Sequence, residues 1–394
     1  MKENLEIKLK IILICSIKKH ILNKVRNLRG DIIMYLSGVK GELKEYFNIL
    51  CDNDYPEFIN KYIELDEMQR LKGIDQFCGC YYTKIFKNKY WYSRLDHSIA
   101  TSLMTWHFTK DKTQTLSALF HDLGTPSFSH CVDFLMGDSI KQESSEKDVM
   151  SIIRNSKKIN EYLKLDGIDV NDLDTQKYGV VENDHPSICV DRLDGVFGTC
   201  LIWNNYFGIE DIREIYKDMT VLINEKGKEE LGFSKLSSAL KFFNGSMFYA
   251  YILQRCEDKY VMNFISSILD KLIKTRELSY EDLYVLTEDE IIKIINNTNC
   301  SVWNKFTNSK EVNRLNKKLY NLYIVSGEVK KRFVIPLVMH NDKISRINDI
   351  SSECNDRIVE FMEYKDSKYC YVESIYDKEL YMNNRLLKTR KRIV

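Results

Sequence analysis

The sequence has little proline, with only four prolines among 394 residues. Together with a hydrophobic content of 44%, this excludes a disordered chain and favours an ordered, mostly helical globule. Near the N-terminus, the apolar run Ile11–Ile17 is far shorter than the roughly 20 residues that cross a bilayer. No small-residue cleavage site follows it, so an amphipathic helix with a basic face is favoured over a signal peptide.

The chain also lacks an excess of charge of either sign and lacks an ordered cysteine pattern. Lys and Arg number 58 against 57 Asp and Glu, which leaves a net charge of +1. No strong global field therefore attracts nucleic acid or a membrane, although local basic patches leave weak nucleic-acid contact open. The 11 cysteines form no disulfide framework and no paired C-x-x-C zinc site, which indicates reduced thiols in a cytoplasmic protein.

The pattern of apolar residues divides the chain into three regions. Residues 1–40 form an N-terminal extension, and residues 41–319 carry helical periodicity. Residues 320–394 contain the β-branched and aromatic runs "NLYIVSG", "KKRFVIPLVM" and "YCYVESI", followed by a basic tail. The sequence thus predicts a mainly α fold with a small α+β C-terminal region. Residues 185–202, with Pro186 near their start, and residues 248–274 are each expected to form one long helix.

Histidines and aspartates occur at the ends of the predicted helices. His97 opens one helix, and His121 with Asp122 closes the next apolar helix. A single histidine on an apolar helix is more often a core residue than a ligand, and a His-Asp pair is common by chance. Asp191 and Asp194 lie on a very apolar helix, where a buried carboxylate costs several kcal/mol unless it is compensated.

The two aspartates are expected to face different surroundings on that helix. At about 100° per residue, one apolar stripe is formed by Val190, Leu193, Phe197, Cys200 and Leu201. Asp191 lies on the other side, beside Gly195 and Gly198, where there is room for a neighbouring helix or a bound group. This face would let Asp191, rather than Asp194, approach a bound group. Close helix packing with a capped or salt-bridged aspartate is the alternative explanation.

Taken together, these residues suit a metal ion. Two imidazoles and two carboxylates from three helices are typical ligands of Mn, Fe, Ni or Zn. Such a set can leave coordination positions open for water and a phosphoryl oxygen. A metal would also neutralise the carboxylate and satisfy the imidazole at the end of a buried helix.

The surrounding motifs resemble those of a known family. "QRLKGIDQFCGCYY" (69–82), "SRLDHS" (93–98), "HDLGTPSFSH" (121–130) and "VDRLD" (190–194) occur in order. They resemble the HD phosphohydrolase superfamily, and within it the deoxynucleoside triphosphate triphosphohydrolase branch that includes the SAM-and-HD-domain protein. The resemblance implies an HD-type helical bundle in residues 41–319 and a homo-oligomer. It also implies a divalent metal, Mg included, bound by His97, His121, Asp122 and Asp191.

The resemblance further assigns roles around the metal and marks departures from the family. It implies that Gln76 contacts the sugar and that Arg94 and Arg192 contact phosphate, with Arg192 replacing a lysine. Arg94 as a helix-entry salt bridge is the alternative. Asp133, or His130 behind it, is the candidate for orienting water or moving a proton, with a core role as the alternative for His130. The departures lie at Thr125 and Gln142, where the family has histidines, at Gly195, where it has an aromatic, and at Thr199, where it has an acid.

The resulting hypothesis is a metal-dependent phosphohydrolase acting on a nucleotide or a small phosphate ester. A nucleotide-binding sensor with little turnover is the first alternative, because both family histidines are replaced. A phosphodiesterase or nuclease is the second, although the balanced charge does not favour it.

Overall fold

The computed structural model describes residues 41–142, 147–203 and 205–380. The predicted N-terminal helix and the basic C-terminal tail lie outside these residues. The chain divides into two units between residues 49 and 50. The described part of the first unit, residues 41–49, consists of a turn residue and the first eight residues of helix α2 (Glu42–Cys51). The second unit, residues 50–394, holds all the candidate site residues.

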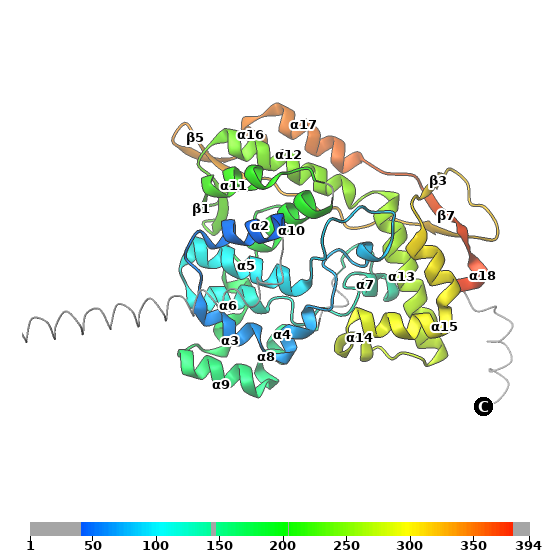
Figure 1. Ribbon diagram of the computed structural model, residues 1–394. Coiled ribbons are helices and arrows are strands. Elements are labelled where there is room, and N and C mark those ends of the chain that lie inside the picture. The colour runs from blue at the N-terminus through cyan, green and yellow to red at the C-terminus, as the bar shows by residue number, and fades with distance from the viewer. Residues whose placement is uncertain (1–40, 143–146, 204, 381–394) are drawn as a thin grey trace, which may run out of the picture. The chain divides into compact units, whose positions relative to one another are not determined.

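Helices dominate the second unit (Figure 1), which confirms the predicted mainly helical fold with a small β part. Up to residue 198 they are α3 (Asn60–Ile63), α4 (Asp66–Leu71), α5 (Arg94–Thr109), α6 (Lys112–Phe120), α7 (Cys131–Leu135), α8 (Val149–Asn155), α9 (Lys157–Asp166) and α10 (Val190–Gly198). Beyond it they are α11 (Ile209–Asp218), α12 (Leu236–Ile252), α13 (Cys256–Thr275), α14 (Asp282–Val285), α15 (Glu288–Asn308), α16 (Ile347–Ile350), α17 (Ser352–Glu363) and α18 (Asp377–Leu380). Among the helices described, none has both the length and the apolar character of a membrane span.

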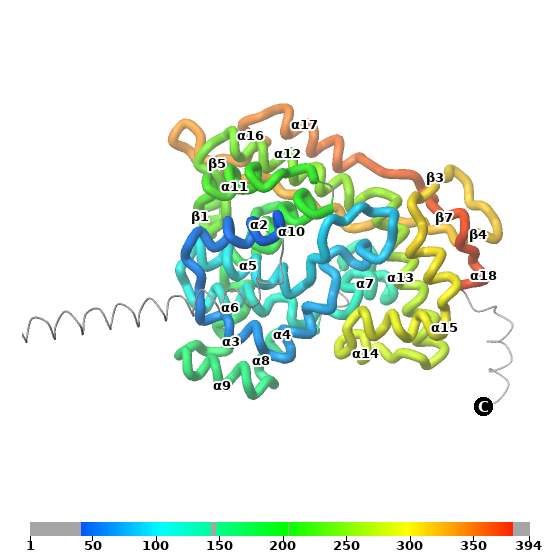
Figure 2. Tube along the Cα trace, viewed as in Figure 1, coloured from blue at the N-terminus to red at the C-terminus, as the bar shows by residue number. Residues whose placement is uncertain are grey.

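Two small sheets accompany the helices. The first has the order β1-β2-β5-β6, from β1 (Met219–Ile223), β2 (Glu229–Phe233), β5 (Leu337–His340) and β6 (Lys343–Arg346). The second has the order β3-β7-β4, from β3 (Asn313–Leu315), β7 (Tyr369–Tyr376) and β4 (Leu322–Ser326). Figure 2 shows the chain between β4 and β5 crossing from the second sheet to the first. The sequence missed the β1–β2 hairpin, which lies within the region of helical periodicity.

The first sheet joins the two regions that the sequence separates at residue 320. β2 pairs in parallel with β5, with Gly232 opposite Leu337 and Phe233 opposite Val338. A side chain at Gly232 would clash, because a Cβ atom there would lie 2.8 Å from the Leu337 carbonyl oxygen. Glycine at this position therefore allows the close approach of the two strands.

The interior of the second unit is organised around α5. All residues from Arg94 to Thr105 are buried, because α5 packs against α4, α6 and α10. The Ser93–Asp96 capping box starts the helix: the Ser93 hydroxyl accepts from the Asp96 backbone N–H, and the Asp96 carboxylate accepts from the Ser93 N–H. A polar side chain in the first turns of α5 therefore faces other helices rather than water.

Two predicted long helices are shorter than expected. Residues 185–189 form a turn, and α10 begins at Val190, so Pro186 precedes the helix instead of lying in its first turn. The run 248–274 is broken between Ile252 and Cys256. The break has a tertiary cause, because the Asp366 carboxylate accepts from the Cys256 backbone N–H at 2.8 Å and caps α13.

Candidate metal centre and cavity

His97 lies in the first turn of α5 and its side chain is fully buried. Its Nδ1–H donates to Asp194 Oδ2 at 2.6 Å, because a carboxylate can only accept. The other ring nitrogen, Nε2, lies 3.0 Å from Asp191 Oδ1 and 3.1 Å from His121 Nε2. The bond to Asp194 thus directs Nε2 at the other candidate ligands, and when the ring is neutral it leaves the lone pair on Nε2.

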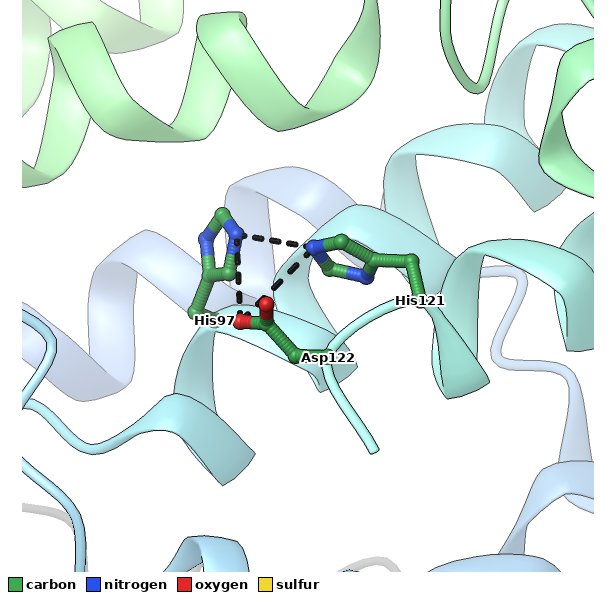
Figure 3. A group of neighbouring side chains, drawn as sticks. All are labelled: His97, His121 and Asp122. Atoms are coloured by element: carbon green, nitrogen blue, oxygen red, sulfur yellow. Dashed lines mark hydrogen bonds and ion pairs between the residues drawn. The ribbon is translucent and has the colours of Figure 1, made fainter. Parts of the chain in front are cut away.

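His121 and Asp122 follow the last residue of α6. His121 Nδ1–H donates to the Ala118 carbonyl oxygen at 2.7 Å, which again leaves the lone pair on Nε2. Figure 3 shows the His121 ring, the His97 ring and the Asp122 carboxylate directed toward one another. Asp122 Oδ2 lies 3.8 Å from His121 Nε2 and 3.9 Å from His97 Nε2. The predicted position of this pair, at the end of a buried helix, is therefore confirmed.

Asp191 and Asp194 lie one turn apart on α10, and both contact the His97 ring. Asp191 lies toward the cavity, with 40% of its side chain exposed, whereas Asp194 is completely buried. The predicted apolar stripe of α10 is buried, as expected. Asp194, which the sequence analysis did not include among the ligands, contacts His97 Nδ1 and accepts a hydrogen bond from the Tyr92 hydroxyl at 2.9 Å, so the choice of Asp191 over Asp194 as a ligand stays a prediction. The spacing of three residues on one helix was the signal available in the sequence.

The spacing of the His97, His121 and Asp122 donor atoms is compatible with a metal ion, and Asp191 lies beside the two histidines. Metal–nitrogen and metal–oxygen bonds of about 2.0–2.2 Å place neighbouring ligand atoms roughly 3.0–3.5 Å apart. Asp191 Oδ1 lies 3.0 Å from His97 Nε2 and 3.8 Å from His121 Nε2. The atoms of His97, His121 and Asp122 all lie within 4.8 Å of one another. Two imidazole nitrogens and two carboxylates favour positive charge between them, which a proton or a metal ion can supply, so the residues fit the metal that the sequence predicts.

The pKa values of His97, Asp122 and Asp191 are shifted in directions that favour positive charge at this cluster. Burial opposes charge on His97, but its hydrogen bonds to Asp191 and Asp194 outweigh burial and raise its pKa to about 10. Without a metal, Nε2 therefore carries a proton, which a metal ion would replace. Burial would raise the pKa of Asp122, but Arg94 and the two histidines hold it below the ordinary value. The pKa of Asp191 is likewise lowered, because the hydrogen bond from His97 overcomes burial. Both carboxylates are therefore ionised at neutral pH.

A cavity of about 570 Å³ opens beside this cluster. His121, Asp122 and Asp191 line one part of it. The rest of the lining includes basic side chains, the aromatic residues Tyr92 and Tyr249, and the segment 329–334. The metal ligands and a ligand-sized space thus meet in one place.

Arg94 and Arg192 both line the cavity, but each is already paired. Arg94 Nη1 donates to Asp122 Oδ2 at 3.0 Å, in a buried ion pair. Arg192 Nη2 donates to Glu182 Oε1 at 2.8 Å, and Arg192 Nη1 donates to the Ser187 carbonyl oxygen at 2.6 Å. Their contact with phosphate stays a prediction. Glu182, with Cys189 and Asp191, forms a second group with metal-binding atoms, but its carboxylate already accepts from Arg192.

Gln76 lies in the cavity wall, and its side-chain oxygen is buried without a hydrogen-bond partner among the residues that the structure describes. A buried amide oxygen without a partner costs about 1–3 kcal/mol. A donor on a bound ligand, such as a hydroxyl group, would relieve this cost. The position is compatible with the predicted sugar contact, which remains a prediction.

His130 and Asp133 form a pair in which His130, and not Asp133, lines the cavity. His130 Nδ1–H donates to Asp133 Oδ2 at 2.9 Å, and Asp133 is fully buried behind it. The order of the pair is thus the reverse of the sequence-based expectation. Burial lowers the pKa of His130 to about 4, with Arg332 and Arg94 acting in the same direction and the bond to Asp133 opposing them. His130 is therefore neutral at pH 7.

Thr125 and Gln142, where the resembling family has histidines, are both buried. The Thr125 hydroxyl donates to Asp122 Oδ1 at 3.0 Å, so it supports a candidate metal ligand. Gln142 Oε1 accepts from Arg332 Nη2 at 2.8 Å. The sequence analysis did not identify Arg332, because the residues around it indicate only a basic β segment.

Asp258, in the first turn of α13, is the other cavity residue that the sequence did not reveal. Its side chain is 4% exposed and lies near the Cys80 thiol. Burial raises the pKa of Asp258 to about 7, and Arg332 opposes the rise. Asp258 thus adds an acidic group on the α13 side of the cavity.

Comparisons with known proteins give the fold and a distant sequence relative. No protein-family model matches the sequence. An uncharacterized protein of Bacillus subtilis, YdhJ, is 23% identical over 242 residues, which are 60% of this chain and 70% of that protein. The crystal structure of a phosphohydrolase from Bacteroides thetaiotaomicron is 13% identical with a TM-score of 0.55, over 84% of this chain and 95% of that one.

A hypothetical protein from Aquifex aeolicus has a TM-score of 0.48 and 15% identity, over 81% of this chain and 93% of that one. At these levels of identity, the similarity to the Bacteroides phosphohydrolase shows that this chain has a similar fold. It does not transfer an activity.

Proposed function

We propose that this protein is a metal-dependent phosphohydrolase of the HD type that acts on a nucleotide or a related phosphate ester. The observation that carries the proposal is the convergence on the two histidines of Asp122 Oδ2 and Asp191 Oδ1: His97 Nε2 and His121 Nε2 lie 3.1 Å apart, and each lies 3.0 to 3.9 Å from both carboxylate oxygens. The cavity beside these atoms has room for a small phosphate ester.

The four residues named above would hold the ion, and Asp194 would keep His97 in the correct tautomer. When bound, a divalent metal polarises a phosphoryl oxygen and lowers the pKa of a coordinated water. Arg94 lies 3.0 Å from the ligand carboxylate of Asp122, and its charge would balance negative charge that develops on the phosphoryl group. Arg192 would add to that charge from α10.

Cavity residues other than the candidate metal ligands support the proposal that the substrate is a nucleotide. Gln76 offers an unpartnered acceptor, and Tyr249 of α12 approaches Gly195, where a Cβ atom would lie 3.7 Å from the tyrosine hydroxyl oxygen. An aromatic side chain is thus present beside the position where the resembling family carries one on α10. A sugar or base could pack against it.

Hydrolysis of a panel of phosphate compounds tests the proposal. Purified protein is incubated with nucleoside mono-, di- and triphosphates, with and without EDTA and with added Mn or Ni. Release of phosphate, pyrophosphate and triphosphate is measured. We expect metal-dependent release that His121→Ala abolishes and that His340→Ala, a histidine outside the cavity lining, retains. Binding without turnover would favour a sensor, and metal-independent hydrolysis would contradict the proposal.

Replacement of the family histidine by Thr125 should make hydrolysis of ordinary deoxynucleoside triphosphates slow. General acid–base catalysis is worth about 10²–10⁴-fold, and neither Thr125 nor Gln142 titrates near neutral pH. The measurement is a pH–rate profile with dGTP and other phosphate esters for wild type, Thr125→His and His130→Ala. Fast wild-type turnover of dGTP that both variants retain would show that the replaced histidines are irrelevant.

A further inference from the structure

The segment 328–336, between β4 and β5, forms one wall of the cavity although it lies more than 130 residues from every candidate metal ligand in sequence. Its backbone is hydrogen-bonded at several points to other parts of the second unit. These bonds include those from Lys330 N to Ser139 O, Gln254 Nε2 to Lys330 O, Phe333 N to His185 Nε2 and Ile335 N to Pro186 O. Side chains of this segment are therefore held in place at the cavity.

Among the described residues, Arg332 is the cavity arginine without an ion-pair contact to a carboxylate, although its charge acts on Asp258 from a longer range. Arg94 is paired with Asp122 and Arg192 with Glu182. In the part of the chain that the structure describes, Arg332 makes no ion pair; its Nη2 instead contacts Gln142 Oε1 at 2.8 Å and His130 Nε2 at 3.4 Å. A half-buried guanidinium held by neutral acceptors retains most of its capacity to bind an anion.

The contact with His130 has a second effect. Because Nδ1–H of His130 is bound to Asp133, the lone pair of His130 is on Nε2. Arg332 donates toward that lone pair, so Nε2 is occupied while Arg332 stays where it is. The charged groups acting on the imidazole are Asp133 of α7, Arg332 of the segment and Arg94 of α5.

We propose that Arg332 binds a second anionic group of the substrate, beyond the phosphoryl group at the metal cluster, and thereby releases His130 Nε2 to accept a hydrogen bond from substrate or water. The proposal rests on the proposed function for the location of the first phosphoryl group. Arg332 would favour substrates with two or more anionic groups, such as a phosphate chain, over simple monoesters. Arg332 would be a specificity-determining residue, and it would also position His130.

The first part of the proposal, anion binding by Arg332, is tested by the binding of inorganic tripolyphosphate and inorganic phosphate, which does not depend on hydrolysis. Isothermal titration is carried out on the full chain as purified, for wild type, Arg332→Gln and Lys331→Gln. Arg332→Gln should weaken tripolyphosphate binding about 10- to 100-fold, the value of a charged hydrogen bond, and should change phosphate binding little. Lys331 is the matched control, since it lies one residue away but binds the carbonyl oxygens at the end of α17. Equal losses for both probes, or for both variants, would overturn the proposal.

The pKa of His130 tests the second part of the proposal, in which Arg332 positions His130. In protein with ¹³C-labelled histidines, NMR titration gives the pKa of His130, with His130→Ala to assign its signal. Arg332→Gln should raise this pKa, because it removes a cation and a donor to Nε2, and Arg332→Lys should raise it less. A pKa that does not change in Arg332→Gln contradicts the positioning role. If the wild type hydrolyses nothing, the proposed function fails, while the tripolyphosphate and NMR results still decide the role of Arg332.

Discussion

Purified protein should carry close to one equivalent of a divalent transition metal, and Asp122→Ala and Asp122→Asn should both lose it. The carboxylate of Asp122 is one of the four converging donors and is held ionised by Arg94. Neither alanine nor a neutral amide replaces an anionic oxygen ligand well. Elemental analysis of freshly purified protein is the measurement.

The two substitutions should differ in stability. Asp122→Ala leaves the buried guanidinium of Arg94 without its ion-pair partner, which costs about 3–5 kcal/mol. Asp122→Asn keeps an acceptor for Arg94 and should unfold at a higher temperature than the alanine variant. Asp270→Asn serves as the control, because Asp270 pairs with Lys274 outside the cavity lining and its loss should leave the metal in place. A metal-free wild type that neither binds nor is stabilised by added Mn or Ni would refute the metal centre.

Asp191→Asn should abolish metal binding, and Asp194→Asn should weaken it about 10- to 100-fold, the usual effect of losing a residue that orients a metal ligand. Asp191 Oδ1 is itself one of the converging atoms. Asp194 instead accepts from His97 Nδ1 at 2.6 Å and is fully buried. Asparagine at position 194 can still accept this bond, but it lacks the charge that makes the imidazole a stronger ligand.

Competition titration with a chelating indicator measures both affinities. Tyr92→Phe, which removes only the hydroxyl that donates to Asp194, provides the graded comparison and should have a smaller effect than Asp194→Asn. Full metal affinity in Asp194→Asn would show that the contact with His97 is structural alone. Full affinity in Asp191→Asn would mean that Asp191 is not a ligand.

The sequence by itself determined those features that depend on local periodicity and on residue chemistry. Ser93 and Asp96 are spaced as a capping box, and this starts α5 where His97 can lie in its first turn. The apolar run before His121 places that residue at the end of α6. The kinds of ligand, imidazole and carboxylate, follow directly from the amino-acid types in the sequence, and they already indicated a borderline divalent metal.

Only the tertiary structure decided which distant residues meet. Asp194 and His97 are 97 positions apart, and Arg332 and His130 are 202 apart, and helical periodicity carries no information about such pairs. The β1–β2 hairpin and the break before α13 have the same origin. β2 is paired with β5 from the far end of the chain, and Asp366 caps α13. Local propensity is a weak preference that a sheet partner or a cap from another segment overrides.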